Sequence, residues 1–404
     1  MKRRPFYGWP VALATSVVSL LAVAVPPAAA APGLQVGVVD HALALGKPDQ
    51  LGPSLRALGA QVVRVNLYWG GKFRVPRTKP IDGADPADRA YDWRPYDRVV
   101  LEAESARAEV AFTIFGTPAW ANGGRPPNRP PRDAEALEDF AYAAATRYSG
   151  SYERDDGTLL PRVRFWIAWN EPNIPLGLVP QWRREGRRWV VQSARAYAEI
   201  CNAIYEGVHF SLLKGQKVAC GVTAPRGNNS PRRKRPSVDP LAFLRAMKSA
   251  GARTFDAYAH QPYYGSRFES PSTRPRGPRA ITLGNIDQLV REVTRLYGRK
   301  RIWITEYGYE TGPPDFTFGV SWAQQARYLR QAFAIARRHP RIDLMLWFLV
   351  KDEYRLHGWQ SGLVSKTGKR KPSFAAFRQV SRGARAEVEA LKARASAATA
   401  IGGP

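Results

Sequence analysis

Hydrophobic and polar positions form two alternating patterns between about residues 34 and 380 of the chain. Short runs rich in β-branched and aromatic residues predict eight strands, at residues 34–39, 61–67, 109–115, 163–169, 217–222, 255–260, 301–306 and 342–349. Longer amphipathic stretches predict seven helices between them, at residues 49–58, 96–107, 133–148, 186–212, 239–250, 285–297 and 321–338. A final helix is expected near residues 373–380.

Strands that alternate with helices predict parallel βαβ units, and eight of them make an α/β fold of the (β/α)8 TIM barrel type in a single domain. An open, doubly wound sheet is the alternative. It needs a glycine-rich phosphate turn after an early strand, and Gly37-Val38-Val39-Asp40 does not supply one. The strand-to-helix loops are long, and those at residues 118–131 and 265–278 are rich in Pro and Gly. We expect functional residues on these loops, because barrel active sites lie at the carboxyl ends of the strands.

The first 31 residues have the pattern of a signal peptide. Lys2, Arg3 and Arg4 precede an apolar stretch at residues 11–25, and the alanines at residues 28–30 offer a cleavage site. An uncleaved anchor is the alternative, but this stretch is shorter than the roughly 20 residues that a membrane span needs. We therefore expect a signal peptide at 1–31, the barrel domain at 32–380 and a frayed helix with a disordered tail at 381–404. The mature protein is expected to be a secreted, extracellular monomer that is not bound to a membrane.

Two glutamates stand where predicted strands end. The fourth strand is followed by Asn170-Glu171-Pro172-Asn173, and the seventh by Glu306-Tyr307-Gly308. Both carboxyl groups should therefore point into the mouth of the barrel. Hydrolysis of a glycosidic bond with retention needs such a pair, one acid to protonate the leaving oxygen and one carboxylate to attack the anomeric carbon. A single glutamate at such a place is more often a helix cap or ion-pair partner, but the pairing on strands four and seven favours catalysis.

The segments Trp169-Asn170-Glu171-Pro172-Asn173 and Ile304-Thr305-Glu306-Tyr307-Gly308 resemble the acid/base and nucleophile motifs of clan A retaining glycoside hydrolases, with the nearest likeness to families 5 and 39. The resemblance extends from about residue 34 to residue 380. It implies that Glu171 is the general acid/base and Glu306 the nucleophile of an O-glycosyl hydrolase. It implies further substrate-binding or supporting positions, namely Arg64, Asn170, His260, Tyr263 and the sugar platform Trp347.

The second predicted strand agrees with this likeness. Val63, Val65 and Leu67 alternate with polar residues that include Arg64, so one set should face the helices and the other the barrel interior. A buried Arg64 needs an acceptor such as Glu306, although an ordinary interior salt bridge would satisfy it equally.

Two departures from the family pattern stand out. The third strand is followed by Trp120 and lacks the His that many members carry there, so Trp120 is either a substitute platform or a packing residue. Tyr263 and Tyr264 are adjacent, and we favour Tyr263 as the partner of Glu306. We expect one cleft lined by Trp347, Trp120, Tyr263 and Trp69.

The formal net charge of +27 indicates possible anionic partners but says nothing about the fold. An Arg-rich coding bias explains much of it, yet several predicted mouth loops are basic. Their residues are Arg183, Arg184, Arg226, Arg232, Arg233, Lys234, Arg235, Arg267, Arg274, Arg276, Lys351 and Arg355. The substrate is therefore expected to be a carbohydrate, which the basic loops make a candidate for an anionic glycan. Residues 232–235 resemble a nucleic-acid-binding run, but export argues against that use.

Neither the five His nor the two Cys show metal-ligand spacing, so we expect no metal and no other cofactor. Cys201 and Cys220 form either one disulfide or two buried thiols. A non-catalytic carbohydrate- or polyanion-binding protein on the same barrel is the main alternative to the hydrolase. Such a protein has no reason to keep Glu171 and Glu306 together with Arg64, which favours the enzyme. Transglycosylation would use the same residues.

Overall fold

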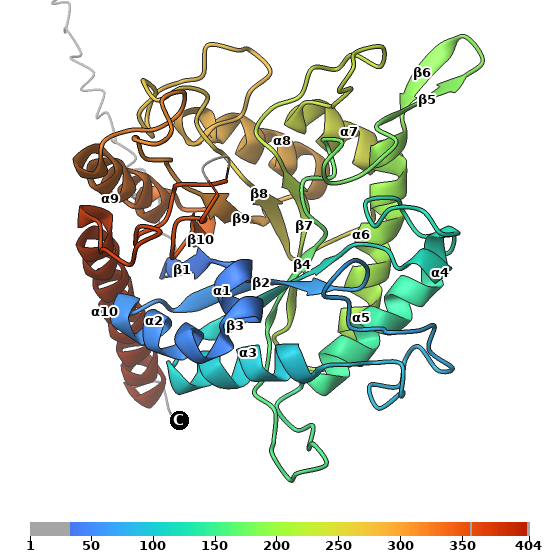
Figure 1. Ribbon diagram of the computed structural model, residues 1–404, viewed down its shortest axis with the longest axis horizontal. Coiled ribbons are helices and arrows are strands. Elements are labelled where there is room, and N and C mark those ends of the chain that lie inside the picture. Colours follow the sequence, from blue (N-terminus) through green and yellow to red (C-terminus); the bar gives the residue numbers. More distant parts are fainter. Residues whose placement is uncertain (1–32, 356–357, 402–404) are drawn as a thin grey trace, which may run out of the picture.

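The computed structural model describes residues 33–355 and 358–401, so the predicted signal peptide lies outside the described residues. Eight parallel strands close into a barrel in the order β1-β10-β9-β8-β7-β4-β3-β2 (Figure 1). They are β1 (Gln35–Val39), β2 (Val62–Tyr68), β3 (Glu109–Phe115), β4 (Phe165–Ala168), β7 (Lys217–Thr223), β8 (Ala257–His260), β9 (Arg301–Tyr307) and β10 (Ile342–Phe348). The predicted TIM barrel is confirmed, because a doubly wound sheet would remain open.

Helices surround the barrel in Figure 1. They are α1 (His41–Gly46), α2 (Leu51–Leu58), α3 (Arg94–Ser105), α4 (Ala119–Asn122), α5 (Glu135–Arg147), α6 (Gln192–Phe210), α7 (Pro240–Ser249), α8 (Asp287–Tyr297), α9 (Trp322–Arg338) and α10 (Pro372–Ile401), with short 3-10 turns at Pro48–Gln50 and Leu283–Asn285. Across the described residues, no helix has both the length and the apolar character needed to cross a membrane.

Two segments differ from the sequence prediction. Residues 186–191 were expected to begin a helix, but β5 (Trp182–Glu185) and β6 (Arg188–Val191) form an antiparallel hairpin that stands away from the barrel in Figure 1. Trp and Val in these strands favour extended structure. The last helix is longer than predicted, since α10 packs along α9 and α2 and continues through Ile401. At residue 381 the Ser381 side chain is buried and donates to the carbonyl of Gly59, so the helix is still docked there.

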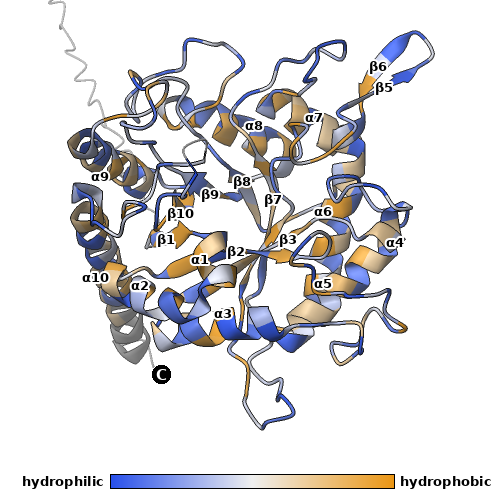
Figure 2. Cartoon of the chain, in the orientation of Figure 1, coloured by the Kyte–Doolittle hydropathy of each residue, from blue (hydrophilic) through white to orange (hydrophobic). Residues whose placement is uncertain are grey.

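The barrel has two apolar layers. An inner layer includes Val62, Trp303 and Leu346, and a larger outer layer, between the strands and the helices, includes Val63 and Val65. The alternation predicted for the second strand is therefore observed. Figure 2 shows hydrophobic residues along several strands and parts of the helices, and hydrophilic residues along many of the long loops.

The strand pairing is irregular in two pairs of strands, β9 with β10 and β7 with β8. The pairing of β9 with β10 shifts between Ile304↔Met345 and Tyr307↔Trp347, which places one extra residue in β9. The pairing of β7 with β8 shifts after Gly221, where Gly221 has φ 95 and Val222 has φ 47. A side chain on Gly221 would collide with the ring of Tyr258. Such bulges re-aim side chains near active sites.

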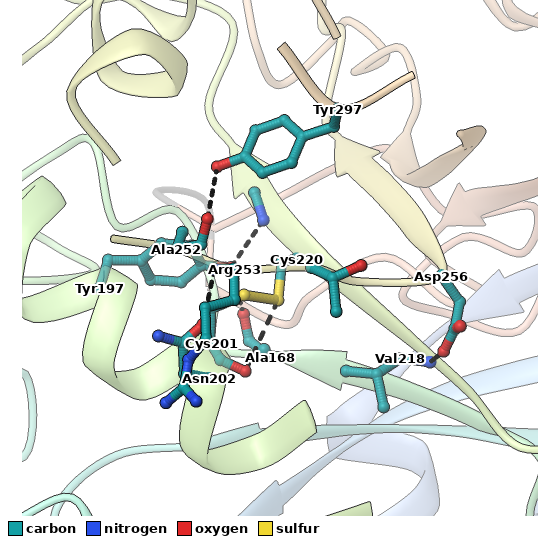
Figure 3. The surroundings of a disulfide bond; sticks show 12 residues. Ala168, Tyr197, Cys201, Asn202, Val218, Cys220, Ala252, Arg253, Asp256 and Tyr297 are labelled. Atoms are coloured by element: carbon teal, nitrogen blue, oxygen red, sulfur yellow. Dashed lines mark hydrogen bonds between the residues drawn. A yellow bond between two sulfur atoms is a disulfide. The ribbon is translucent and has the colours of Figure 1, made fainter. Parts of the chain in front are cut away.

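One disulfide joins α6 to β7 (Figure 3). Cys201 and Cys220 are fully buried, and their Cα atoms lie 5.9 Å apart. Beside the disulfide, the hydroxyl of Tyr197 donates to the carbonyl of Ala168 at 2.8 Å and accepts from the backbone N–H of Gly221 at 2.7 Å. Helix α6 is thus fastened to the carboxyl end of β4 and to the bulge in β7. The sequence left the pairing of the cysteines open, and the structure settles it as a disulfide.

Candidate active site

A cleft of about 620 Å³ opens at the carboxyl ends of the barrel strands. Its walls come from the loops after six strands and contain both polar and aromatic side chains. The lining includes His41, Asn66, Asn170, Glu171, Arg226, Tyr263, Glu306, Glu310, Phe348 and Trp359. The two predicted catalytic glutamates thus share one cleft, as their places at the strand ends require.

The bulge in β9 directs Glu306 into this cleft. In β9, Ile302 and Ile304 belong to the outer apolar layer and Trp303 belongs to the inner one. Strict alternation would therefore turn Glu306 outward with Ile302 and Ile304. The extra residue before Tyr307 changes the alternation, so Tyr307 packs in the outer layer while Glu306 lines the cleft.

Arg64, on β2, contacts Glu306 from inside the barrel. Its Nη1 lies 2.6 Å from Oε1 of Glu306, and its Nη2 donates to Oδ1 of Asn170 at 2.7 Å. Its Nε donates to Thr113 at 2.7 Å. Arg64 is fully buried, so its charge needs these acceptors. One guanidinium therefore fixes Glu306 and Asn170 relative to each other.

Tyr263 holds the other oxygen of Glu306. Its hydroxyl donates to Oε2 at 3.0 Å. Burial, together with the negative charges of Glu306 and Glu171, keeps the pKa of Tyr263 well above its usual range, so the phenol stays a donor. The neighbouring Tyr264 points elsewhere, since its hydroxyl donates to the carbonyl of Phe318 at 3.1 Å. Of the two adjacent tyrosines, it is Tyr263 that contacts Glu306.

Glu171 stands where the chain leaves β4 in a tight, left-handed turn. Trp169 has φ 70 and Glu171 has φ 43, and the Glu171 N–H donates to the carbonyl of Val222 at 2.9 Å. Gly177 packs directly beneath this turn. A Cβ at position 177 would lie 2.1 Å from the Glu171 carbonyl and 2.3 Å from that of Asn170, so only glycine fits.

Burial raises the pKa of the Glu171 carboxyl from 4.5 to about 8. The negative charge of Glu306 adds to this shift, and the positive charge of Arg64 opposes it less strongly. Glu171 therefore carries a proton at neutral pH. The cleft holds one carboxylate in contact with a cation and one neutral carboxylic acid, which are the two protonation states that an acid-assisted nucleophilic displacement needs.

Asn170 presents a donor to the cleft. Its Oδ1 accepts from Arg64 and, at 2.7 Å, from Nε2 of Gln261. Because that oxygen faces two donors, the Nδ2 group of Asn170 remains for a ligand. Sequence analysis missed Gln261, which is fully buried and acts only through Asn170.

His41 and Asn66 form a second polar pair that sequence analysis missed. Nδ1 of His41 accepts from the backbone N–H of Asn66 at 3.1 Å. Burial, assisted by the charge of Arg64, lowers the pKa of His41 to about 3, so the ring is neutral with its proton on Nε2. Oδ1 of Asn66 is buried and accepts no hydrogen bond from the described residues. The Nε2 proton of His41 is therefore the group of this pair that can bind a sugar hydroxyl.

Three tryptophans that we expected in the cleft lie elsewhere. Trp347 is fully buried in the outer layer and donates from Nε1 to the carbonyl of Ser361, because Leu344, Leu346 and Phe348 occupy the inner face of β10. Trp69 is in the core with its ring 5.8 Å from that of Trp120, and neither lines the cleft. The platform assignments of Trp347, Trp120 and Trp69 are therefore wrong.

The aromatic walls come instead from Phe348, the residue after Trp347, and from Trp359 in the following loop. The ring of Trp359 lies 5.3 Å from that of Tyr263 and 5.3 Å from that of Phe348. About a third of Trp359 is exposed, so its face is available to a ligand. Such a face suits the apolar side of a sugar ring.

His260 is also not a cleft residue. It is fully buried, with Nδ1 2.8 Å from Thr223 Oγ1 and Nε2 3.0 Å from the carbonyl of Ile281. Burial lowers the pKa of His260 to about 4. The residue is a satisfied core histidine that ties β8 to the loop after it. The predicted substrate contact at His260 is therefore wrong.

Glu310 is a third acidic residue of the cleft that the sequence did not single out. Burial raises the pKa of Glu310 from 4.5 to about 7. Its carboxyl group accepts a hydrogen bond from the Gln360 N–H at 3.4 Å, which lowers the pKa but less strongly than burial raises it. Within the described residues, no group of three or more His, Cys, Asp and Glu is arranged to hold a metal ion.

Comparison with known proteins agrees with this geometry. Residues 281–377 match the family model described as glycosyl hydrolase catalytic core, and this segment contains Glu306, Glu310 and Trp359. None of the curated proteins compared with the chain matches it.

Solved structures share the fold at low identity. A family 39 glycoside hydrolase from Bacteroides cellulosilyticus WH2 is 18% identical, with a TM-score of 0.59 over 87% of this chain and 64% of that one. A glucosidase from Croceicoccus marinus is 15% identical, with a TM-score of 0.61 over 88% and 68%. A GH5_18 protein from Streptomyces cattleya, solved in complex with GlcNAc, is 15% identical, with a TM-score of 0.53 over 88% and 81%.

The chain thus spans less than two thirds of the family 39 protein's length. The predicted likeness to clan A glycosidases is confirmed, and the family match together with the fold supports a glycosidase.

Proposed function

We propose that this glycosidase is a secreted, retaining O-glycosyl hydrolase that cleaves plant or microbial polysaccharides, or their oligosaccharides, by double displacement. The observation that carries the proposal is the contrast between the two glutamates of one cleft. Glu306 contacts Arg64 and Tyr263, whereas burial keeps Glu171 protonated. A retaining hydrolase needs a nucleophile and a separate acid in these two states.

In the first step, an oxygen of Glu306 attacks the anomeric carbon and the bond to the leaving oxygen breaks. Glu171 gives its proton to that oxygen, so the leaving group departs as an alcohol. In the second step, Glu171, now a carboxylate, takes a proton from water. The resulting hydroxide attacks the anomeric carbon, breaks its bond to Glu306 and releases the sugar. Attack by a sugar hydroxyl in place of water would give transglycosylation.

The polar walls of the cleft orient the sugar. The Nδ2 group of Asn170, held by Arg64 and Gln261, is placed to donate to the hydroxyl beside the anomeric carbon. His41 supplies a donor for a further hydroxyl. The exposed ring of Trp359 supports an apolar sugar face.

The test is a panel of aryl glycosides and polysaccharides with purified mature protein. Proton NMR should detect the first sugar product with the anomeric configuration of the substrate. A first product of opposite configuration contradicts the double displacement. Binding without turnover of any member of the panel contradicts the enzyme and favours a non-catalytic binding protein. Export and cleavage are tested separately, by expressing the full chain and identifying the N-terminal residue of the secreted protein by mass spectrometry.

A further inference from the structure

The cleft continues on both sides of the two glutamates. A hollow of about 710 Å³ shares His41 and Phe348 with it. A second hollow, of about 420 Å³, shares Arg226 and Gly265 with it. The three hollows therefore adjoin in sequence across the mouth of the barrel, with Glu171 and Glu306 in the middle one. We call this row of hollows the mouth groove.

Cations line the first outer hollow, between the segment after β1 and the loop after β10. Lys47, Lys351, Arg355 and Lys366 all contribute to its walls, and no salt bridge ties their side chains within the described residues. The nearby carboxyl groups do not balance them.

Two of those carboxyl groups have other partners. Asp40 is buried and accepts the N–H of Leu43 at 2.8 Å; its pKa is raised by burial to about 6, so it keeps most of its negative charge at pH 7, and with Glu353 it offsets only two of the four cations. Asp352 is paired with Nζ of Lys371 at 2.7 Å. Glu353 remains, and it accepts the N–H of Trp359. This end of the mouth groove is therefore positive on balance.

Cations also line the second outer hollow. Arg226, Arg276 and Arg279 form its walls with one acidic residue, Glu269, which lies 3.9 Å from Arg226. Arg276 and Arg279 are exposed.

The loop after β7 extends this positive end. Arg279 donates to the carbonyl of Asn228 at 3.2 Å, which brings that loop alongside. Its run of basic residues, 232–235, is exposed and makes no salt bridge in the part of the chain described. The run that resembled a nucleic-acid motif thus lies beside the mouth groove.

A closed pocket would accept only a chain end, whereas the mouth groove has room for sugars on both sides of the cleaved bond. Cations without partners at both ends attract negative charge, and a groove with charge of one sign concentrates an oppositely charged ligand. The molecule is basic throughout, so the net charge of +27 does not distinguish this site. The position of the cations does, because they line both outer hollows of the same groove.

We infer that the mouth groove binds an internal stretch of an anionic polysaccharide, bearing carboxylate or sulfate groups, and that the enzyme cuts such chains internally. This inference rests on the proposed function, since it names the substrate class of the same site. The anionic groups contact Lys351 and Lys366 at one end and Arg276 and Arg279 at the other, while the sugar between them lies against Glu171 and Glu306.

Binding is tested first, on protein with Glu306→Gln so that the polymer stays intact. Affinity electrophoresis with hyaluronan, κ-carrageenan and barley β-glucan separates uronate, sulfate and neutral chains. At 50 mM NaCl we expect either anionic polymer to bind at least about tenfold more tightly than the neutral one, and most of this difference to vanish at 500 mM. Equal affinity for all three polymers overturns the inference, and the stronger of the two anionic polymers identifies the substituent.

The groove is then altered by Lys351→Gln, Lys366→Gln, Arg276→Gln and Arg279→Gln together. Each exposed ion pair contributes modestly, so the four changes should weaken binding of the anionic polymer by about tenfold or more. The matched control is Lys214→Gln with Arg299→Gln, two exposed cations in helix-to-strand loops at the opposite end of the barrel. If the control weakens binding as much per charge removed, the effect is general basicity and the inference fails.

Internal cleavage is tested on active protein by following viscosity and reducing ends together. We expect viscosity to fall steeply while few reducing ends appear, with oligosaccharides as first products. Release of single sugars from the start contradicts internal cleavage. If aryl glycosides turn over but anionic polymers are cut no faster than neutral ones, the inference fails and the proposed function stands. If anionic polymers bind through the four cations and no substrate turns over, the proposed function fails and only the binding site remains.

Discussion

Glu306 and Glu171 are the same residue type at the same end of one barrel, yet their surroundings differ in almost every respect. Glu306 ends a strand, and both of its oxygens have partners in Arg64 and Tyr263. Glu171 lies in a left-handed turn after a strand, and burial rather than a partner sets its protonation. The comparison shows that contacts with Arg64 and Tyr263 define the nucleophile, whereas burial without such partners favours the protonated form of the acid.

The largest effect should follow from replacing Glu306, the glutamate whose two oxygens both have partners. Glu306→Gln keeps the shape of the side chain but removes the attacking carboxylate. We expect kcat on every substrate to fall by more than about 10⁴-fold, because no other group can form the covalent intermediate. Initial rates on aryl glycosides measure this, and Glu104→Gln, at an exposed position on α3, is the control. Appreciable residual turnover would give the nucleophilic role to another residue.

Glu171→Ala should have an effect that depends on the leaving group. Aryl glycosides with poor leaving groups need the proton and should lose about 10²–10⁴-fold in kcat/KM, whereas good leaving groups should lose far less in the first step. Azide, which needs no general base, should restore turnover and give a glycosyl azide with the configuration of the substrate. If azide instead rescues Glu306→Ala, with inversion, and leaves Glu171→Ala inactive, the two roles are reversed.

Arg64→Met tests whether the partners of Glu306 also hold the barrel together. The change leaves Glu306, Thr113 and the side-chain amide oxygen of Asn170 without their shared donor. Breaking such a buried pair should lower the free energy of unfolding by about 3–5 kcal/mol.

Urea denaturation at pH 7 measures this loss for the single variant and for Arg64→Met with Glu306→Gln. The double variant should recover part of the loss, because it no longer buries an unpaired carboxylate. A double variant as unstable as the sum of the two single changes would show that the pair does not interact.

The smallest effect on activity should come from pH, through the proton on Glu171. The pKa of Glu171 is raised to about 8 in the folded protein, above the 4.5 of an unperturbed side chain, so the folded state holds this proton more tightly. That contribution to stability is complete below pH 4.5 and is lost as pH rises through 8. We expect kcat/KM to fall on an alkaline limb near pH 8, as the acid loses its proton.

Glu171→Gln places an uncharged side chain at this position, so it should remove the pH dependence that Glu171 gives to the free energy of unfolding. Its free energy of unfolding should exceed that of the unchanged protein at pH 8.5, by up to about 4 kcal/mol, and should match it near pH 4.5. Thermal melts across this range give the comparison. A constant difference at all pH values would mean that burial does not control the proton on Glu171.

The repeating pattern of the sequence was sufficient to predict the barrel and the strand ends at which the two glutamates lie. Side-chain orientation within the strands was predicted less well. Trp347 was expected in the cleft from its motif, but the inward series Leu344, Leu346 and Phe348 places it among the helices. That series was readable in the sequence as an alternation of apolar residues. The bulge in β9 was not, because only its pairing with β10 reveals the extra residue.

Contacts between residues far apart in the chain could not be predicted from the sequence either. Gln261 and His41 matter because of what they contact, and those contacts depend on how loops after different strands fold against one another. Each looks ordinary in its own segment. Arg64 was predictable because a charge on the inner face of a strand requires a partner, whereas a neutral amide or imidazole raises no such demand.

The disulfide between Cys201 and Cys220 has a consequence for how the chain is made. The two cysteines are 19 residues apart, so at about 5–20 residues per second they emerge within a few seconds of each other. At that moment β8, β9 and β10 have yet to be synthesised. Once both sulfur atoms reach an oxidising compartment, the bond can fasten α6 to β7 before the rest of the barrel has formed, and a closed loop of this size removes about 3 kcal/mol of conformational freedom from the unfolded chain. The disulfide would then restrict the conformation of the first half of the barrel before the strands of the second half pair with it.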